Sequence, residues 1–90
     1  MLTLSRHKQF VKEYKKIRFT DKHYSRYIQY LSKLIEEKSL PVEAKDHSLK
    51  GEYQDCREFH ISGDLLVIYR IEENRLQLLR IGSHSELFSS

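Results

Sequence analysis

The sequence predicts one α+β domain, spanning residues 1–90, in which an antiparallel pair of helices packs on one face of a mainly antiparallel sheet. Apolar residues recur at helical spacing in the first half of the chain. Apolar and alternating runs typical of strands fill the second half, and only three glycines and one proline interrupt the chain. The expected order is therefore strand, helix, helix, three strands and a short C-terminal helix.

The first part of the chain predicts a short strand and a basic helix. Residues 2–5 alternate apolar and polar side chains, which is typical of a strand, and Ser5 is a candidate helix cap. Phe10, Tyr14 and Ile17 then follow at helical spacing and form a narrow apolar stripe.

A second helix is the most strongly patterned element. Thr20 or Asp21 can cap its first turn, and Pro41 disfavours helical geometry at Leu40, which predicts that the helix ends there. The polar side carries Lys22, Arg26 and Lys33. The apolar face consists of Tyr24, Tyr27, Ile28, Leu31, Leu34 and Ile35.

The second half predicts a loop followed by a three-stranded meander. Residues 42–52 have no clear period and are interpreted as a loop. Strands are expected over residues 52–61, 65–71 and 75–81, with turns at 62–64 and 72–74, and Ser83 or Ser85 can cap a final helix. No segment remains to cover the sheet face opposite the two helices, so this face is predicted to be partly open and to serve as a substrate platform.

Composition and charge narrow the class of protein. The single cysteine, Cys56, excludes an internal disulfide and a zinc site built on cysteine pairs. The longest apolar run, residues 65–69, is far shorter than the roughly 20 residues that span a bilayer, and the first residues lack the apolar core of a signal peptide. We therefore expect a soluble, cytoplasmic protein without a membrane partner.

The net charge of +3 is divided unevenly. Residues 1–35 hold nine lysines and arginines against two acids, whereas residues 36–90 hold seven against eleven. A basic half indicates an anionic partner, either a nucleic acid or an acidic protein segment. The alternative is a solvated helix face.

Several residues of the second half are suited to proton transfer. The antiparallel meander is expected to bring them to one end of the sheet. Two histidines and a cation can cleave RNA without a metal, because one takes the 2′-OH proton, the other protonates the leaving 5′-oxygen, and Arg80 or Lys50 neutralises the phosphate. The products would be a 2′,3′-cyclic phosphate and a 5′-hydroxyl. The candidate catalytic residues are His47, His60, Asp64 and His84.

Each of these residues also has a structural interpretation. His47 and His60 suit a loop and a strand end, Asp64 suits a turn after Gly63, and the stem of Arg80 can cover the sheet. A three-histidine metal site is a further alternative, but the sequence lacks the His-x-His and His-x-x-x-His pairs typical of one.

Four segments in this order resemble the YafQ branch of the RelE superfamily, the toxins of bacterial type II toxin–antitoxin pairs. They are KDHSLKG at 45–51, REFHISGD at 57–64, LLVIY at 65–69 and RIGSHSELF at 80–88. The motifs are specific in combination, and the likeness covers nearly the whole chain when the two helices are included.

The resemblance implies a RelE-like fold and a ribosome-dependent mRNA endonuclease that acts in the decoding site of the 70S ribosome without a metal or other cofactor. It also implies a cognate antitoxin. The family's acid matches Asp64, its phosphate-contacting arginine matches Arg80, and its terminal aromatic matches Phe88, which could stack on a base. The functional histidines match His47, His60 and His84; we expect His84 to be the general acid and either of the others the base.

Two other functions are compatible with the same fold class. A toxin of the ParE kind blocks gyrase by binding, and it generally lacks this set of histidines. A basic RNA-binding module without catalysis is the third possibility. Fold alone does not decide between them.

Overall fold

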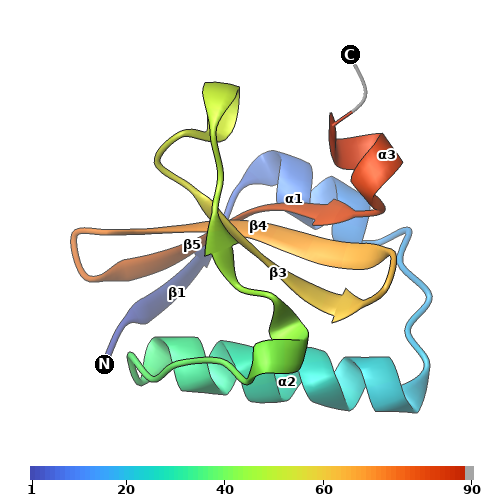
Figure 1. Cartoon of the computed structure of the whole chain (residues 1–90), viewed down its shortest axis with the longest axis horizontal. Helices are drawn as coiled ribbons and strands as arrows, with labels where there is room; N and C mark the ends of the chain where they lie inside the picture. Colours follow the sequence, from blue (N-terminus) through green and yellow to red (C-terminus); the bar gives the residue numbers. More distant parts are fainter. Residues whose placement is uncertain (89–90) are drawn as a thin grey trace.

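The structure is a computed structural model that describes residues 1–88 and has the predicted α+β architecture (Figure 1). Its five-stranded sheet has the order β1-β5-β4-β3-β2, in which β1 is parallel to β5 and the other pairs are antiparallel. The strands are β1 (Thr3–Arg6), β2 (His47–Ser48), β3 (Arg57–Ser62), β4 (Leu65–Glu72) and β5 (Arg75–Gly82). The helices are α1 (Lys8–Tyr14), α2 (Asp21–Ile35) and α3 (His84–Phe88), and two 3₁₀ turns are η1 (Val42–Ala44) and η2 (Gly51–Tyr53).

Helix α2 begins as the sequence predicts. The hydroxyl of Thr20 accepts a hydrogen bond from the backbone N–H of His23 at 3.1 Å, which satisfies one of the free donors of the first turn. Its apolar face packs on one side of the sheet, where it contributes to the main core together with Phe59, Tyr69 and Leu78. The buried residues of this face are Tyr27, Tyr30, Leu31 and Leu34.

The end of α2 differs from the prediction, because the helix stops at Ile35 rather than near Pro41. Glu37 adopts a left-handed conformation with φ of 61°. The N–H of Lys38 donates to the carbonyl of Lys33 at 2.8 Å, and this Schellman-type bond terminates the helix without glycine.

Helix α1 also begins later than predicted. Ser5 does not cap it, because the backbone from Thr3 to Arg6 pairs with β5. The cap is instead His7, which makes no side-chain capping bond, and the helix ends at Tyr14, before Ile17.

The sheet face opposite α2 is covered in part, so the expectation that no segment remains to cover it was wrong. The predicted loop at 42–52 contains β2, η1 and the start of η2. Figure 1 shows α2 and α3 on opposite sides of the sheet. A second apolar cluster lies on the α3 side and consists of Cys56, Leu66, Ile68, Leu79 and Leu87, with Leu49, Tyr53 and Phe88 packed against it. Within residues 1–88, no helix combines the length and the apolar character needed to cross a membrane.

Candidate active site

A buried carboxylate joins two of the predicted histidines. Side chains alternate along β3, so Phe59 and Ile61 enter the main core while Glu58 and His60 face the α3 side. His47 on β2 pairs directly with Glu58. One oxygen of Glu58, Oε1, lies 3.1 Å from Nε2 of His47 and 3.3 Å from Nε2 of His60. The ring centroids of the two histidines are 6.4 Å apart, and the Glu58 carboxylate contacts both rings. Glu58 is only 4% exposed.

The hydrogen-bond partners distinguish the two histidines. Nδ1 of His47 lies 2.6 Å from the carbonyl oxygen of Lys45, so both ring nitrogens of His47 face acceptors. Only the doubly protonated ring donates to both. His60 contacts an acceptor through Nε2 alone, so its neutral tautomer with the proton on Nε2 leaves Nδ1 free to accept a proton.

Glu58 is a residue that sequence reasoning missed. The signal was its position two residues before His60 on a strand, which puts both side chains on one face. Its second oxygen, Oε2, is buried and has no hydrogen-bond partner in the described part of the chain. An unsatisfied buried carboxylate oxygen lowers stability, and a catalytic role is one explanation for keeping such a group.

His84 opens helix α3 at the end of β5. Ser83 and Glu86 form a capping box, since Ser83 Oγ accepts from the N–H of Glu86 and Glu86 Oε1 accepts from the N–H of Ser83 at 2.9 Å. These bonds from Ser83 hold the pKa of the Glu86 carboxyl below its usual value. The ring of His84 lies 4.8 Å from that of Phe88. Asp64 contacts the backbone N–H of His84 at 3.4 Å rather than a histidine ring.

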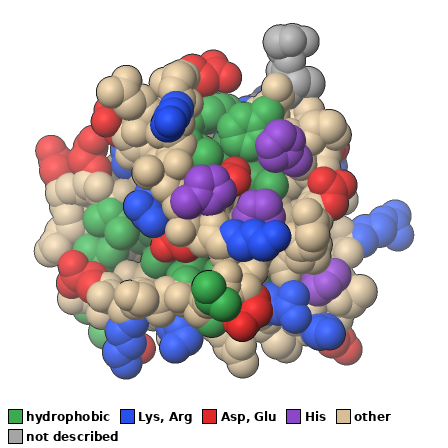
Figure 2. All heavy atoms as spheres, viewed as in Figure 1, with side chains coloured by type: hydrophobic (Ala, Val, Ile, Leu, Met, Phe, Trp, Pro, Cys, Tyr) green, Lys and Arg blue, Asp and Glu red, His purple; other side chains and the backbone are tan. Residues whose placement is uncertain are grey.

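The register of the sheet shows how far His84 lies from the pair formed by Glu58 and His60. Leu66 on β4 pairs with His60 on one side and with Gly82 on the other. Neighbouring strands are about 4.8 Å apart, so the backbones of His60 and Gly82 are roughly 10 Å apart. His84 follows two residues later. Histidine side chains gather on one face of the molecule in Figure 2, with lysine or arginine beside them.

Arg80, the predicted phosphate ligand, is held by α1. Its Nε and Nη2 donate to the carboxylate of Glu13 at 2.9 and 2.7 Å, and Nη1 donates to the hydroxyl of Tyr53 at 2.8 Å. The bond to Glu13 raises the pKa of Arg80. Of its five N–H groups, one on each terminal nitrogen stays available to a ligand.

The other two predicted substrate contacts differ in their surroundings. Phe88 packs edge-on against Tyr53, with ring centroids 5.9 Å apart, and stays partly exposed beside His84. Lys50 is exposed at the start of η2 and forms no ion pair with any residue between 1 and 88. Over the same residues, no three or more His, Cys, Asp and Glu side chains are arranged to hold a metal ion.

Known proteins are similar to this chain in both sequence and fold. The family described as "Bacterial toxin of type II toxin-antitoxin system, YafQ" matches residues 2–89. The chain is 35% identical over 63 residues to the mRNA interferase toxin YafQ of Escherichia coli strain K12. The aligned region covers 68% of this chain and 68% of that protein.

Solved structures extend the likeness over almost the whole chain. A copper-bound mutant toxin from Helicobacter pylori superposes with a TM-score of 0.90 at 37% identity, covering 98% of this chain and 100% of that one. A chain of the Escherichia coli DinJ–YafQ complex superposes with a TM-score of 0.83 at 27% identity, covering 99% and 100%. The chain therefore belongs to the YafQ family, the toxins of bacterial type II toxin–antitoxin systems.

Proposed function

We propose that this toxin is an mRNA endoribonuclease that cuts ribosome-bound mRNA by histidine acid–base catalysis without a metal. The observation that carries the proposal is the Glu58 carboxylate between His47 and His60, on the sheet face from which His84 also emerges. The name mRNA interferase, which the Escherichia coli relative carries, supports the same substrate.

His60 is the general base of this mechanism. Its Nε2–H donates to Glu58, so Nδ1 is the nitrogen that takes the proton from the ribose 2′-OH. Glu58 orients the ring and stabilises the imidazolium that forms, and is a positioning residue. His47 faces acceptors with both nitrogens, which leaves no free lone pair for a base, and it serves to hold the Glu58 carboxylate in position.

His84 is the general acid. The 2′-oxygen attacks the phosphorus, the bond from phosphorus to the 5′-oxygen breaks, and the His84 imidazolium gives its proton to that oxygen. The free N–H groups of Arg80 donate to the non-bridging oxygens as charge builds on them. Asp64 holds the backbone at His84, and Phe88 offers a ring on which a base can stack. The products are a 2′,3′-cyclic phosphate and a 5′-hydroxyl.

The partners follow from the same proposal. The basic residues of the segment 1–35, on β1, α1, α2 and the connection between the two helices, offer charge for contact with ribosomal RNA in the 70S decoding site. The complex of the YafQ relative with DinJ supports a cognate antitoxin that inhibits this chain. Because ribosomes are in the cytoplasm, this proposal also places the toxin there.

The proposal is tested by primer extension on a defined mRNA in 70S ribosomes, with EDTA present. Wild type and His84→Ala are compared, and circular dichroism shows that both fold. We expect codon-phased cuts by wild type and a loss of at least about 100-fold in the variant, the usual size of a general-acid contribution. His23→Ala, at a partly exposed position in the first turn of α2, is the control and should cut normally.

Three outcomes contradict the proposal in different ways. Cuts that EDTA abolishes would overturn the metal-free mechanism. Undiminished cuts by His84→Ala would overturn the assignment of the acid. No cuts by wild type would overturn the nuclease, and a gyrase assay would then test the ParE-like function.

A further inference from the structure

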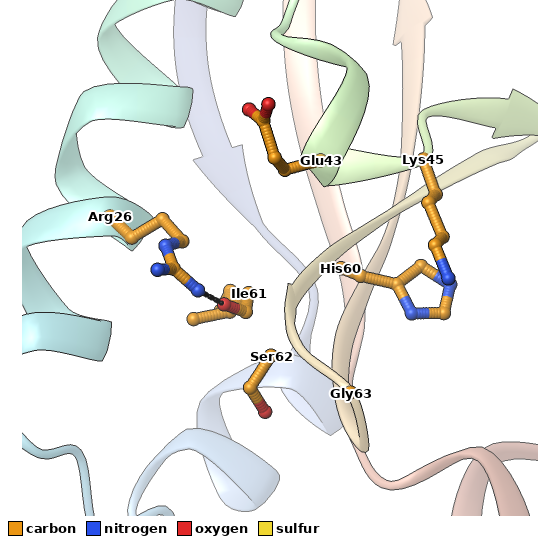
Figure 3. Close-up of a pocket in the computed structure, with 7 residues that line it drawn as sticks. All are labelled: Arg26, Glu43, Lys45, His60, Ile61, Ser62 and Gly63. Carbon is orange, nitrogen blue, oxygen red and sulfur yellow. Dashed lines mark hydrogen bonds between the residues drawn. The ribbon is translucent and has the colours of Figure 1, made fainter.

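A polar hollow lies beside His60, at the open edge of β3 (Figure 3). Strand β2 pairs only with Arg57 and Glu58, so the outer edge of β3 beyond them pairs with no strand among residues 1–88. The hollow has a volume of about 210 Å³. Its lining residues come from α2, η1, β3 and the turns that follow the last two: Arg26, Glu43, Lys45, His60, Ser62 and Gly63, with the backbone of Ile61.

Arg26 reaches this edge from α2. Its Nη1 donates to the carbonyl of Ile61 at 2.7 Å, which satisfies a backbone acceptor that no neighbouring strand reaches (Figure 3). That bond fixes the guanidinium but leaves Nε and Nη2 free, and Arg26 forms no ion pair with a carboxylate of residues 1–88. A fixed guanidinium with a free edge is suited to a phosphate.

Lys45 supplies a second cation and connects the hollow to the catalytic histidines. Its backbone is left-handed, with φ of 50°, a conformation that costs free energy for a residue other than glycine. In this conformation its carbonyl accepts from His47 at 2.6 Å, while its side chain runs beside the His60 ring in Figure 3. Lys45 likewise forms no ion pair within the described residues.

From this geometry we propose that Arg26 and Lys45 form a subsite for a phosphate of the RNA strand next to the scissile one. The inference rests on the proposed nuclease function. His60 belongs to both sites, so a strand whose 2′-OH meets Nδ1 of His60 continues over the β3 edge toward Arg26. Two cations against the single carboxylate of Glu43 give the hollow a net positive charge.

The subsite is tested with mRNAs that carry one neutral methylphosphonate. The substitution is placed at each position flanking the cut, or four nucleotides away as a control. Single-turnover cleavage on 70S ribosomes is followed over a range of toxin concentrations, which separates the maximal rate from the half-saturating concentration. The variant is Arg26→Gln combined with Lys45→Asn, since asparagine tolerates the left-handed backbone. Lys38→Gln, which removes one exposed charge after α2, is the control variant.

We expect one flanking methylphosphonate to raise the half-saturating concentration of wild type about tenfold. The double variant should show that rise already with unmodified mRNA, and no further rise with the methylphosphonate. Independent, multiplying effects of variant and methylphosphonate would overturn the subsite, as would a wild type indifferent to every flanking position. In both of these results the wild type still cleaves unmodified mRNA, so only the subsite is overturned. If the wild type cleaved no mRNA at all, the proposed nuclease function itself would fail.

Discussion

Oε1 of Glu58 lies 3.3 Å from Nε2 of His60, and both side chains belong to the same face of β3. The contact leaves one nitrogen of His60 free while the carboxylate is almost wholly removed from solvent. A carboxylate in this position fixes the tautomer and the orientation of the ring, as it does for histidines that ligate metals or assist nucleophiles.

Replacing Glu58 by Gln is expected to lower the maximal cleavage rate by about 10- to 100-fold. The half-saturating toxin concentration should change little, because Glu58 is buried and does not contact the RNA. Urea unfolding should show somewhat lower stability, because the amide replaces a charged acceptor shared by His47 and His60, and the assay is run where both proteins stay folded. Glu52→Gln, at an exposed position, is the matched control. A rate loss that merely tracks unfolding would contradict the positioning role.

The pair formed by Glu13 and Arg80 ties α1 to the sheet and yields a second prediction. Glu13 accepts from Nε and Nη2 of Arg80 and from the N–H of Ile81 at 3.2 Å, and both side chains are mostly buried. Glu13→Ala should therefore lower the free energy of unfolding by about 2–3 kcal/mol.

A double-mutant cycle measures the coupling within that pair. Glu13→Ala, Arg80→Ala and the double variant are unfolded in urea, and we expect a coupling of at least about 1 kcal/mol between the two sites. Additive losses would mean that the two side chains act separately, and that Arg80 is held in place by Tyr53 instead.

Much of this fold could be predicted because the apolar periodicity of each element and the residues at its ends indicate the same secondary structure. The apolar face of α2 and its cap at Thr20 are local signals, and the turn at Glu73 and Asn74 between β4 and β5 separates two clearly apolar strands. Both turn residues have positive φ, as a tight hairpin requires. Segments without a local signal were missed: β2 is two residues long, and only its pairing with β3 creates it.

The site was harder to predict than the fold, because its contacts join distant parts of the sequence. The histidines could be selected as titratable groups, but the sequence does not say that His47 and His60 share one oxygen of Glu58. Nor does it say that Arg80 meets Glu13, which lies 67 positions earlier. Such pairs depend on the register of the sheet and on the packing of α1 against β5.

A third prediction concerns the C-terminal end of α2. Glu37 has φ of 61°, which costs a residue with a side chain roughly 1 kcal/mol or more. Glu37→Gly removes that cost, although it adds entropy to the unfolded chain and removes an exposed contact with the amino group of Met1. We expect a net gain of about 0.5 kcal/mol in urea unfolding. Glu36→Gly, at a φ of −86°, should instead lose stability; a loss in both variants would contradict the reasoning.

The fourth prediction concerns Tyr69, which anchors the segment that carries His47. The hydroxyl of Tyr69 donates to Asp46 Oδ1 at 2.7 Å, and Arg57 donates to the same oxygen at 3.1 Å. Tyr69→Phe removes a bond to a charged acceptor and should lower stability at pH 7.5 by about 2 kcal/mol. Tyr24→Phe, at a 45% exposed position, should change it by less than about 0.5 kcal/mol.

The stability gap between wild type and Tyr69→Phe should also depend on pH. Burial, and then the bond to Asp46, raise the pKa of Tyr69 above its ordinary value of 10.0. Above pH 10 the unfolded chain therefore loses the phenolic proton while the folded protein keeps it, so this tyrosine's contribution to stability falls by up to about 1.4 kcal/mol per pH unit. Phenylalanine has no such proton, and the gap should narrow between pH 10 and 11 in urea titrations. A gap that stays constant over this range would contradict the raised pKa, because the proton would then be lost from both states alike.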